Sequence, residues 1–101
     1  MNDPPVTRVI VIKNPQGLHA RPAEMLARTA IQFKSEIELV CEGHRADAKS
    51  ILHLLTLGAQ QGTSLAIEAR GQDAELAVET LAKLVESGFA NEEAPREGQV
   101  N

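Results

Sequence analysis

The stretch "DAELAVETLAKLVESG", residues 73–88, carries the clearest secondary-structure signal in the chain. Its apolar residues recur every three or four positions, which is the spacing of one face of a helix. This stripe consists of Ala74, Ala77, Val78, Leu81, Leu84 and Val85. Asp73 belongs to the residue types that cap helix starts, and Gly88 to those that end helices. We therefore predict an amphipathic helix between Asp73 and Gly88 that packs its stripe against a core.

The segments before this helix alternate between strand and helix patterns. The order is strand, helix, strand, strand, helix, strand and helix, over residues 6–13, 20–33, 35–43, 42–47, 50–58, 63–70 and 73–88. The strand patterns alternate apolar and polar residues, which is typical of a half-buried strand. Cys41 falls on the apolar side of its strand, so we interpret it as a core residue. This order predicts an α+β sandwich in which helices cover one sheet face and water covers the other.

Composition favours one small domain and argues against nucleic-acid binding. The chain has 101 residues, of which 43% are apolar, enough for one core but not for two. The net charge is −4 and the aromatic residues are two phenylalanines, so neither a basic face nor a base-stacking surface is expected. We predict a single domain over residues 1–88 and a polar tail, residues 89–101, that is disordered.

The chain also lacks the sequence features of a secreted or membrane protein. The N-terminal residues "MNDPPV" do not resemble a secretory signal, and no apolar run approaches the roughly 18 residues of a membrane span. The single cysteine cannot form an internal disulfide, which fits a reducing compartment. We therefore expect a soluble cytoplasmic protein without membrane insertion.

A histidine stands where a helix should begin, in "NPQGLHARPAEML", residues 14–26. If His19 flanks this helix, the backbone N–H groups of Ala20 and Arg21 have no partner inside it, and Pro22 has no N–H at all. These donors, the positive end of the helix dipole and the Arg21 guanidinium would form an anion site beside the imidazole. Because a neutral ring nitrogen is a nucleophile toward phosphorus, the pattern suggests that His19 itself carries a phosphoryl group.

The ordinary alternative is that His19 is only a polar surface residue, and its position alone leaves this open. His44 and His53 illustrate that alternative, because one lies in an expected turn and the other on an expected helix surface. We assign neither of them a role. The three histidines also lack the spacings of metal ligands, so we expect neither a metal site nor a cofactor.

Three segments together resemble the HPr family, the histidine-containing phosphocarrier proteins of the bacterial phosphoenolpyruvate:sugar phosphotransferase system. They are "GLHARPA" at 17–23, "AKSILHLLTLG" at 48–58 and "QGT" at 61–63. The resemblance runs from about Val6 to Gly88. It implies an open-faced β-sandwich, a four-stranded antiparallel sheet with three helices on one face, in agreement with the order of elements above.

The resemblance also implies a function and two partners. His19 would accept phosphate on Nδ1 from the phosphorylated first enzyme of the system and pass it to the A domain of a sugar-specific second enzyme. Arg21 would be the arginine that stabilises the phosphate. The protein would thus be a phosphoryl carrier rather than an enzyme, and we expect a monomer.

The short helix expected within residues 50–58 contains more apolar residues than one narrow stripe can hold, so some should face outward. Following the family, we place Leu54 and Leu57 in the core. Three residues are assigned to a partner-docking face: Ile51, Leu52 and Leu55. The alternative is that a neighbouring element buries all five. Arg28 could steer acidic partners to this face, although a solvated surface arginine is the more ordinary interpretation.

Ser50 is expected to cap this short helix. In many members of the family the serine at this position is phosphorylated by a dedicated ATP-dependent kinase, so the resemblance implies a serine kinase and a phosphatase as further partners. Phosphate would add a charge of about −1.5 to −2 beside Ile51. The alternative function is therefore a regulatory adaptor of the same fold that is controlled at Ser50. Adaptor-only relatives lack the histidine, so His19 together with Arg21 favours the carrier.

Overall fold

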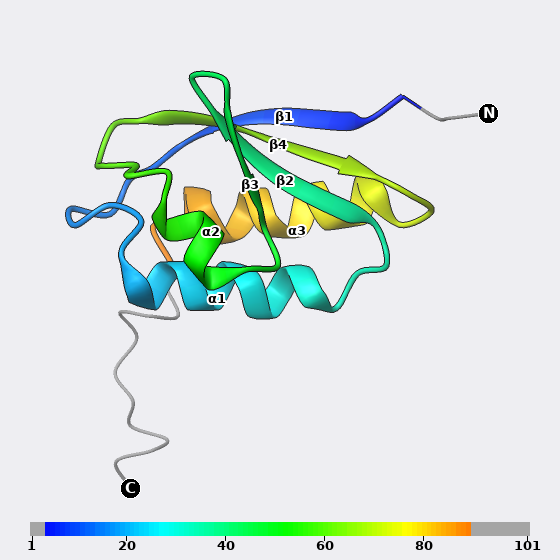
Figure 1. Ribbon diagram of the computed structural model, residues 1–101, viewed down its shortest axis with the longest axis horizontal. Coiled ribbons are helices and arrows are strands. Elements are labelled where there is room, and N and C mark those ends of the chain that lie inside the picture. Colours follow the sequence, from blue (N-terminus) through cyan, green and yellow to red (C-terminus); the bar gives the residue numbers. More distant parts are fainter. Residues whose placement is uncertain (1–3, 90–101) are drawn as a thin grey trace, which may run out of the picture.

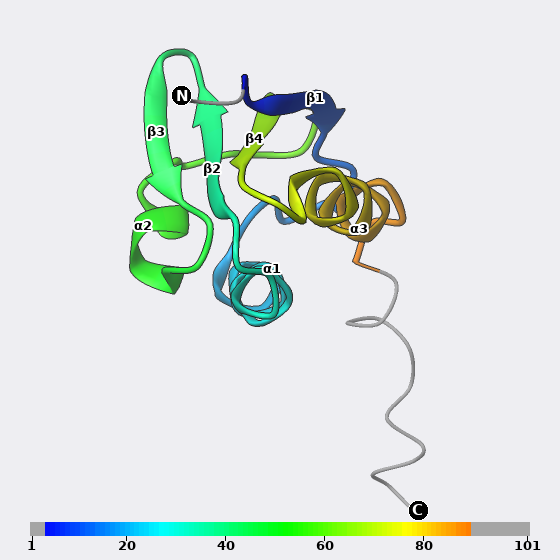
Figure 2. The ribbon, with the colours of Figure 1, turned by 90° about the vertical axis from the view of Figure 1, so that its right-hand side faces the viewer.

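The computed structural model describes residues 4–89, which form a four-stranded antiparallel sheet and three helices (Figure 1). The elements in chain order are β1 (Val6–Val11), α1 (Ala20–Ile31), β2 (Glu36–Cys41), β3 (His44–Asp47), α2 (Ile51–Leu55), β4 (Ser64–Arg70) and α3 (Ala74–Glu86). The strand order in the sheet is β1-β4-β2-β3. All three helices lie on one side of the sheet (Figure 2). The predicted α+β open-faced sandwich is thereby confirmed.

The two central strands, β2 and β4, show why the sheet has one buried face. The two strands pair antiparallel, in a register that places Leu39 opposite Ile67. Alternate side chains of the two strands are buried beneath the helices: Ile37, Leu39, Cys41, Leu65, Ile67 and Ala69. Cys41 is 8% exposed, so it is a core residue as interpreted from its strand pattern.

The two long helices bury the apolar stripes that the sequence predicts. In α3 the buried residues are Ala74, Ala77, Val78, Leu81, Ala82 and Val85, while Leu84 of the predicted stripe is only partly buried. Helix α1 ends at Ile31, two residues before Phe33, the last residue of its predicted pattern. Phe33 is nevertheless half-buried and packs against the core. Among the described residues, no helix combines the length and apolar character needed to cross a membrane.

Asp73 does not cap α3 in the way the sequence suggests. Its side chain makes no capping hydrogen bond to α3. The carboxylate instead accepts hydrogen bonds from the backbone N–H groups of Lys34, at 2.9 Å, and Ser35, at 3.0 Å, and from the Ser35 hydroxyl. These bonds, above all that from the Ser35 hydroxyl, lower the pKa of Asp73. Asp73 thus occupies the predicted position before α3, but its side chain ties the connection between α1 and β2 to the start of α3 and does not cap the helix.

The core extends one residue beyond the predicted end of the domain. Gly88 and Phe89 both adopt left-handed backbone conformations, with φ of 69° and 59°. The Phe89 N–H donates to the Leu84 carbonyl at 3.1 Å, and its side chain is fully buried. Assigning Phe89 to a disordered tail is therefore wrong, because its ring completes the core. The remainder of the predicted tail, residues 90–101, lies outside the described residues.

Candidate functional site

His19 occupies the position immediately before α1, as predicted. Its backbone is extended, with φ −88° and ψ −168°, and its carbonyl accepts a hydrogen bond from the Ala23 N–H at 3.0 Å. The N–H groups of Ala20 and Arg21 therefore lie in the first turn, where the helix provides no carbonyl four residues behind. Pro22 follows and has no N–H. The start of α1 thus presents two backbone donors beside a half-buried histidine, with Arg21 exposed.

The connection from β1 to His19 is held against the loop that precedes β4. The Ile12 N–H donates to the Thr63 carbonyl at 2.9 Å, and the Gly62 N–H donates to the Ile12 carbonyl at 2.8 Å. Further along, the Leu18 N–H donates to the Ala59 carbonyl at 2.9 Å. These bonds fix the residues on the N-terminal side of His19 to a second part of the chain.

Gly17 is the point where the two loops come closest. Its φ of 72° is in the left-handed region, and a Cβ atom built there would lie 2.5 Å from the Ala59 carbonyl oxygen. Only glycine fits both the conformation and the space. Asn14 lies beside it, 5% exposed, and donates from Nδ2 to the Gly17 carbonyl at 2.6 Å. The sequence gives no signal of this burial, because asparagine in a connection before a glycine is an ordinary turn residue.

Ser50 immediately precedes α2 and caps it, as predicted. Its backbone is extended, and its hydroxyl oxygen accepts a hydrogen bond from the His53 N–H at 3.2 Å. The predicted division of the apolar residues of this segment is also observed, because Leu54 is fully buried and Leu57 is partly buried against the core.

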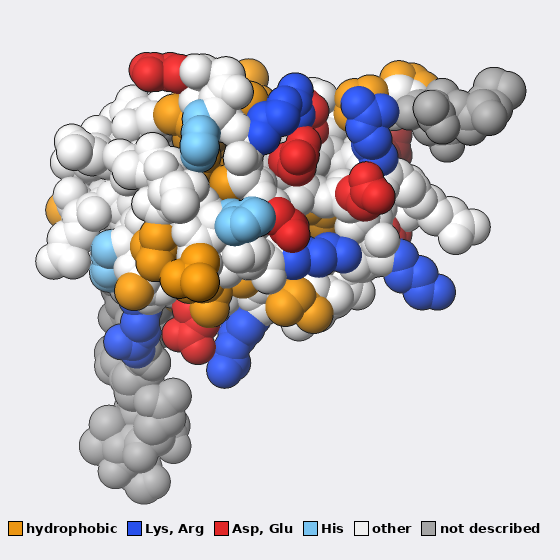
Figure 3. Space-filling view, viewed as in Figure 1, with side chains coloured by type: hydrophobic (Ala, Val, Ile, Leu, Met, Phe, Trp, Pro, Cys, Tyr) orange, Lys and Arg blue, Asp and Glu red, His pale blue; other side chains and the backbone are white. Residues whose placement is uncertain are grey.

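The remaining apolar residues of α2 face outward. Their exposed fractions are 40% for Ile51, 75% for Leu52 and 37% for Leu55. Hydrophobic side chains accordingly gather over α2, with charged side chains of both signs below them (Figure 3). The alternative that a neighbouring element buries all five apolar residues is therefore wrong for the described part of the chain.

The exposed side of α1 continues from Arg21 toward the other end of the helix. Arg28 forms an ion pair with Glu24, at 3.6 Å from Nε to Oε2, and its side chain is 77% exposed. Ile31, one turn further, is 61% exposed. The spacing of opposite charges four residues apart would have indicated this ion pair. Any partner steered by Arg28 must therefore also meet the carboxylate of Glu24.

The other two histidines belong to β3 and α2 and not to the start of α1. His44 begins β3, and its Nε2 lies 3.1 Å from the Thr56 hydroxyl just after α2. His53 is exposed on α2. Among residues 4–89, no group of three or more His, Cys, Asp or Glu side chains is placed so that it could hold a metal ion.

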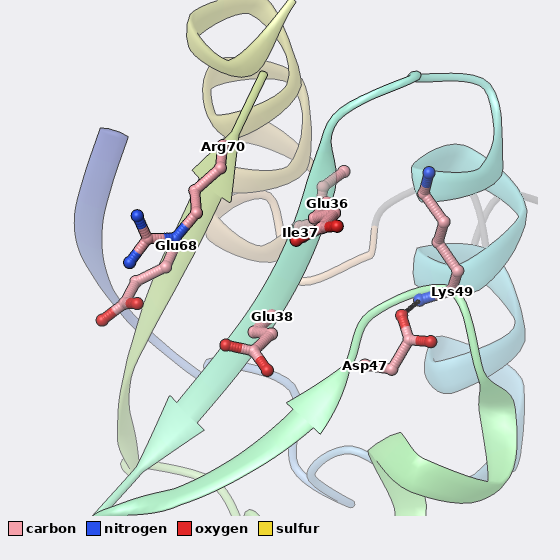
Figure 4. Close-up of a pocket in the computed structure, with 7 residues that line it drawn as sticks. All are labelled: Glu36, Ile37, Glu38, Asp47, Lys49, Glu68 and Arg70. Atoms are coloured by element: carbon pink, nitrogen blue, oxygen red, sulfur yellow. Dashed lines mark hydrogen bonds between the residues drawn. The ribbon is translucent and has the colours of Figure 1, made fainter. Parts of the chain in front are cut away.

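An open hollow of about 400 Å³ lies elsewhere, over β2, the end of β3 and β4 (Figure 4). Four carboxylates line it: Glu36, Glu38, Asp47 and Glu68. Arg45 bridges two of them, at 2.9 Å from Glu68 and 2.8 Å from Glu38, and these hydrogen bonds raise the pKa of Arg45. Lys49 donates to the Phe33 carbonyl at 2.7 Å. The hollow thus adjoins the C-terminal end of α1, about 18 Å along the helix from His19.

Comparison with known proteins assigns the chain to a family. Residues 6–87 match the family model of the PTS HPr component phosphorylation site. Over 78 residues the chain is 46% identical to the phosphocarrier protein HPr of Buchnera aphidicola subsp. Baizongia pistaciae, covering 77% of this chain and 92% of that protein. The chain belongs to the HPr family. HPr is a phosphocarrier of the phosphotransferase system and not a classical enzyme.

Two further relatives of this HPr chain extend the comparison. The crystal structure of HPr-C-His from Thermoanaerobacter tengcongensis superposes with a TM-score of 0.81 at 40% identity, covering 84% of this chain and 96% of that one. The multiphosphoryl transfer protein of Xanthomonas campestris pv. campestris is 40% identical over 86 residues, which are 85% of this chain but 10% of that protein. A sequence similar to most of this chain therefore also occurs within a much longer relative.

Proposed function

We propose that this HPr protein accepts a phosphoryl group on Nδ1 of His19 from the phosphorylated first enzyme of the sugar phosphotransferase system. It then passes the group to the A domains of sugar-specific second enzymes, in the cytoplasm. The position of His19 directly before α1 carries this proposal, because two backbone donors of the first turn lie beside it. Family membership supports it, since relatives that match this chain over 92% and 89% of their own length are named phosphocarrier proteins.

The transfer step needs only the ring nitrogen of His19 and a phosphorylated donor. The lone pair of Nδ1 forms a bond to phosphorus while the bond between phosphorus and the donor group breaks. The electron pair of that broken bond returns to the donor. In the second step the nucleophile of the acceptor protein attacks the same phosphorus, and the electron pair of the P–N bond returns to His19.

The groups around His19 suit a carrier that must release its cargo. The N–H groups of Ala20 and Arg21 and the Arg21 guanidinium would donate hydrogen bonds to the phosphoryl oxygens. Each such bond to a charged group contributes roughly 1.5–3 kcal/mol, and a helix terminus adds about 0.3–1 kcal/mol. These contributions orient a dianion without making its release prohibitively slow.

The exposed face of α2 supplies a surface on which both partners can dock in turn. It presents an apolar group close to α1: Ile51, Leu52 and Leu55. Arg28 adds positive charge that attracts acidic partners. A monomer with this single face would bind the first enzyme and a second-enzyme A domain alternately, since both must reach His19.

Ser50 provides a place for regulation within this docking face. Its hydroxyl already lies at the start of α2, where a helix terminus favours negative charge. A serine kinase that adds phosphate there, and a phosphatase that removes it, would control docking without unfolding the helix.

Replacing His19 with alanine tests the carrier proposal. Wild-type protein incubated with the first enzyme and phosphoenolpyruvate should gain one phosphoryl group by intact mass, stable in base and lost in acid, as expected of a phosphoramidate. His19→Ala should gain none. His44→Ala is the matched control, because it removes a histidine of β3 and should keep full labelling. Labelling of His19→Ala at the wild-type level would refute the assignment.

A further inference from the structure

Asn14 is an unusual residue in the segment that leads to His19. Among the described residues, the polar side chains that are buried belong to Asn14, 5% exposed, and Ser35, 2% exposed. Ser35 donates its hydroxyl to Asp73. Asn14 lies five residues before His19, in the connection between β1 and α1. A buried amide in so short a loop needs a physical explanation.

The hydrogen bonds of Asn14 connect it to His19 through one carbonyl group. Asn14 Nδ2 donates to the Gly17 carbonyl at 2.6 Å, and the backbone N–H of His19 donates to the same oxygen at 3.0 Å. The Gly17 N–H in turn donates to the Asn14 carbonyl at 3.0 Å. Asn14 and His19 are therefore held by the same acceptor.

This carbonyl belongs to the most adaptable residue of the loop. Gly17 has no side chain, so its peptide groups can rotate more freely than those of its neighbours. Contact with the second loop restrains one side, because the Leu18 N–H donates to the Ala59 carbonyl. The Asn14 amide restrains the Gly17 carbonyl itself. The peptide group between Gly17 and Leu18 therefore has a defined orientation.

The other half of the Asn14 amide shows that fold stability alone does not favour this residue. Its Oδ1 is buried and accepts no hydrogen bond from the described residues. An apolar side chain of similar volume, such as leucine, would bury no such atom. Asparagine at this place therefore suggests a role for its donor group beyond filling space.

We propose that Asn14 is the positioning residue of His19. By fixing the Gly17 carbonyl it fixes the His19 N–H and the entry into α1, and so orients the imidazole relative to the N–H groups of Ala20 and Arg21. This inference rests on the proposed function. Asn14 does not touch the phosphoryl group, and it acts only through the backbone of Gly17.

The test compares Asn14→Leu and Asn14→Ala with Val78→Ala, a buried residue of α3 whose truncation destabilises the fold without touching this loop. The rate of transfer from the phosphorylated first enzyme is measured against carrier concentration for each variant. Both Asn14 variants should lower kcat by about tenfold or more and leave KM nearly unchanged, because misplacing a reacting group slows the chemistry itself. Val78→Ala should keep the wild-type kcat at a temperature where every variant is folded.

A second measurement needs no phosphorylation. In ¹H–¹⁵N NMR spectra the His19 amide resonance should shift, and its exchange with solvent should become faster, in both Asn14 variants but not in Val78→Ala. Wild-type kcat in the Asn14 variants, or an equal loss in Val78→Ala, would overturn the positioning role. Wild-type protein that accepts no phosphoryl group would instead overturn the proposed function, which separates the two failures.

Discussion

At the scale of single residues, Arg21 should matter more for the transfer step than for docking. Its charge is exposed beside His19, where the phosphoryl group would carry negative charge as it passes. Arg21→Ala should therefore lower kcat by roughly tenfold to a hundredfold, which corresponds to the 1.5–3 kcal/mol of a hydrogen bond to a charged group. KM for the first enzyme should change by much less. Transfer rates measured against carrier concentration give both constants and so measure this difference.

Arg21→Lys is the matched variant, because it keeps the charge but loses the planar fork of donors. It should recover part of the rate that Arg21→Ala loses. A strongly raised KM with unchanged kcat in Arg21→Ala would show that Arg21 serves docking.

Single residues also show where sequence reasoning succeeds and where it stops. The position of His19 before α1 was predictable, since helix starts follow local rules on caps, Pro22 and free N–H groups. The role of Asp73 was not, because its partners Lys34 and Ser35 lie almost forty residues away and only the folded sheet brings them together. Asn14 was missed for a related reason: the residues that follow it are held by the loop that contains Ala59, which lies about forty residues further along the chain.

At the scale of elements, α2 combines an observed cap with the proposed docking surface, and Ser50→Asp separates the two. Aspartate is a good N-cap and suits the positive end of a helix, so the melting temperature should change little. Its charge would lie beside Ile51, at the edge of the apolar surface that must lose water when a partner docks. Transfer should therefore become markedly slower at partner concentrations below saturation. Each tenfold rise in Kd corresponds to about 1.4 kcal/mol. Calorimetric binding to the first enzyme and thermal unfolding measure the two effects.

Ser50→Ala is the control for the cap alone. It removes the acceptor of the His53 N–H and should cost about 1 kcal/mol of stability while docking stays intact. If Ser50→Asp binds and transfers at wild-type levels, Ser50 is only a helix cap and the regulatory proposal is wrong.

The same helix shows how much of an element follows from sequence. The five apolar residues of this segment exceed one stripe, so outward-facing ones could be expected from the sequence. Which of them face outward came from the family resemblance and not from the spacing, because Ile51 lies three residues before Leu54, on the same side of the helix, and is nevertheless 40% exposed. The nearby pairing of Glu24 with Arg28 was overlooked, although its spacing of four residues is a local signal.

At the scale of the whole molecule, the two ends of α1 have different tasks. The N-terminal end leaves backbone donors and His19 beside the proposed docking face. The C-terminal end is fastened to the rest of the fold, because Lys49 donates to the Phe33 carbonyl and Asp73 holds the two residues that follow. The sheet and α3 hold these two ends in a fixed relation, so a partner that docked on α2 as proposed would meet His19 at a constant place.

Asp73 should therefore make the stability of the whole fold depend on pH in the acid range. Hydrogen bonds from Ser35 and Lys34 lower its pKa in the folded protein below the ordinary value of 3.8. A group with a lowered folded pKa stabilises the fold fully above its unfolded pKa, and this stabilisation is lost as the pH falls through the folded pKa.

Asp73→Asn should reduce the free energy of unfolding at pH 7. Both carboxylate oxygens of Asp73 accept hydrogen bonds, whereas an amide has one oxygen and its NH2 group cannot accept. The difference from wild type should persist down to about pH 5 and shrink below pH 3.8. Urea unfolding at several pH values measures it, with Glu75→Gln, an exposed carboxylate of α3, as the control for net charge. A difference that stays constant down to pH 2 would mean that the contribution of Asp73 does not depend on its ionised carboxylate.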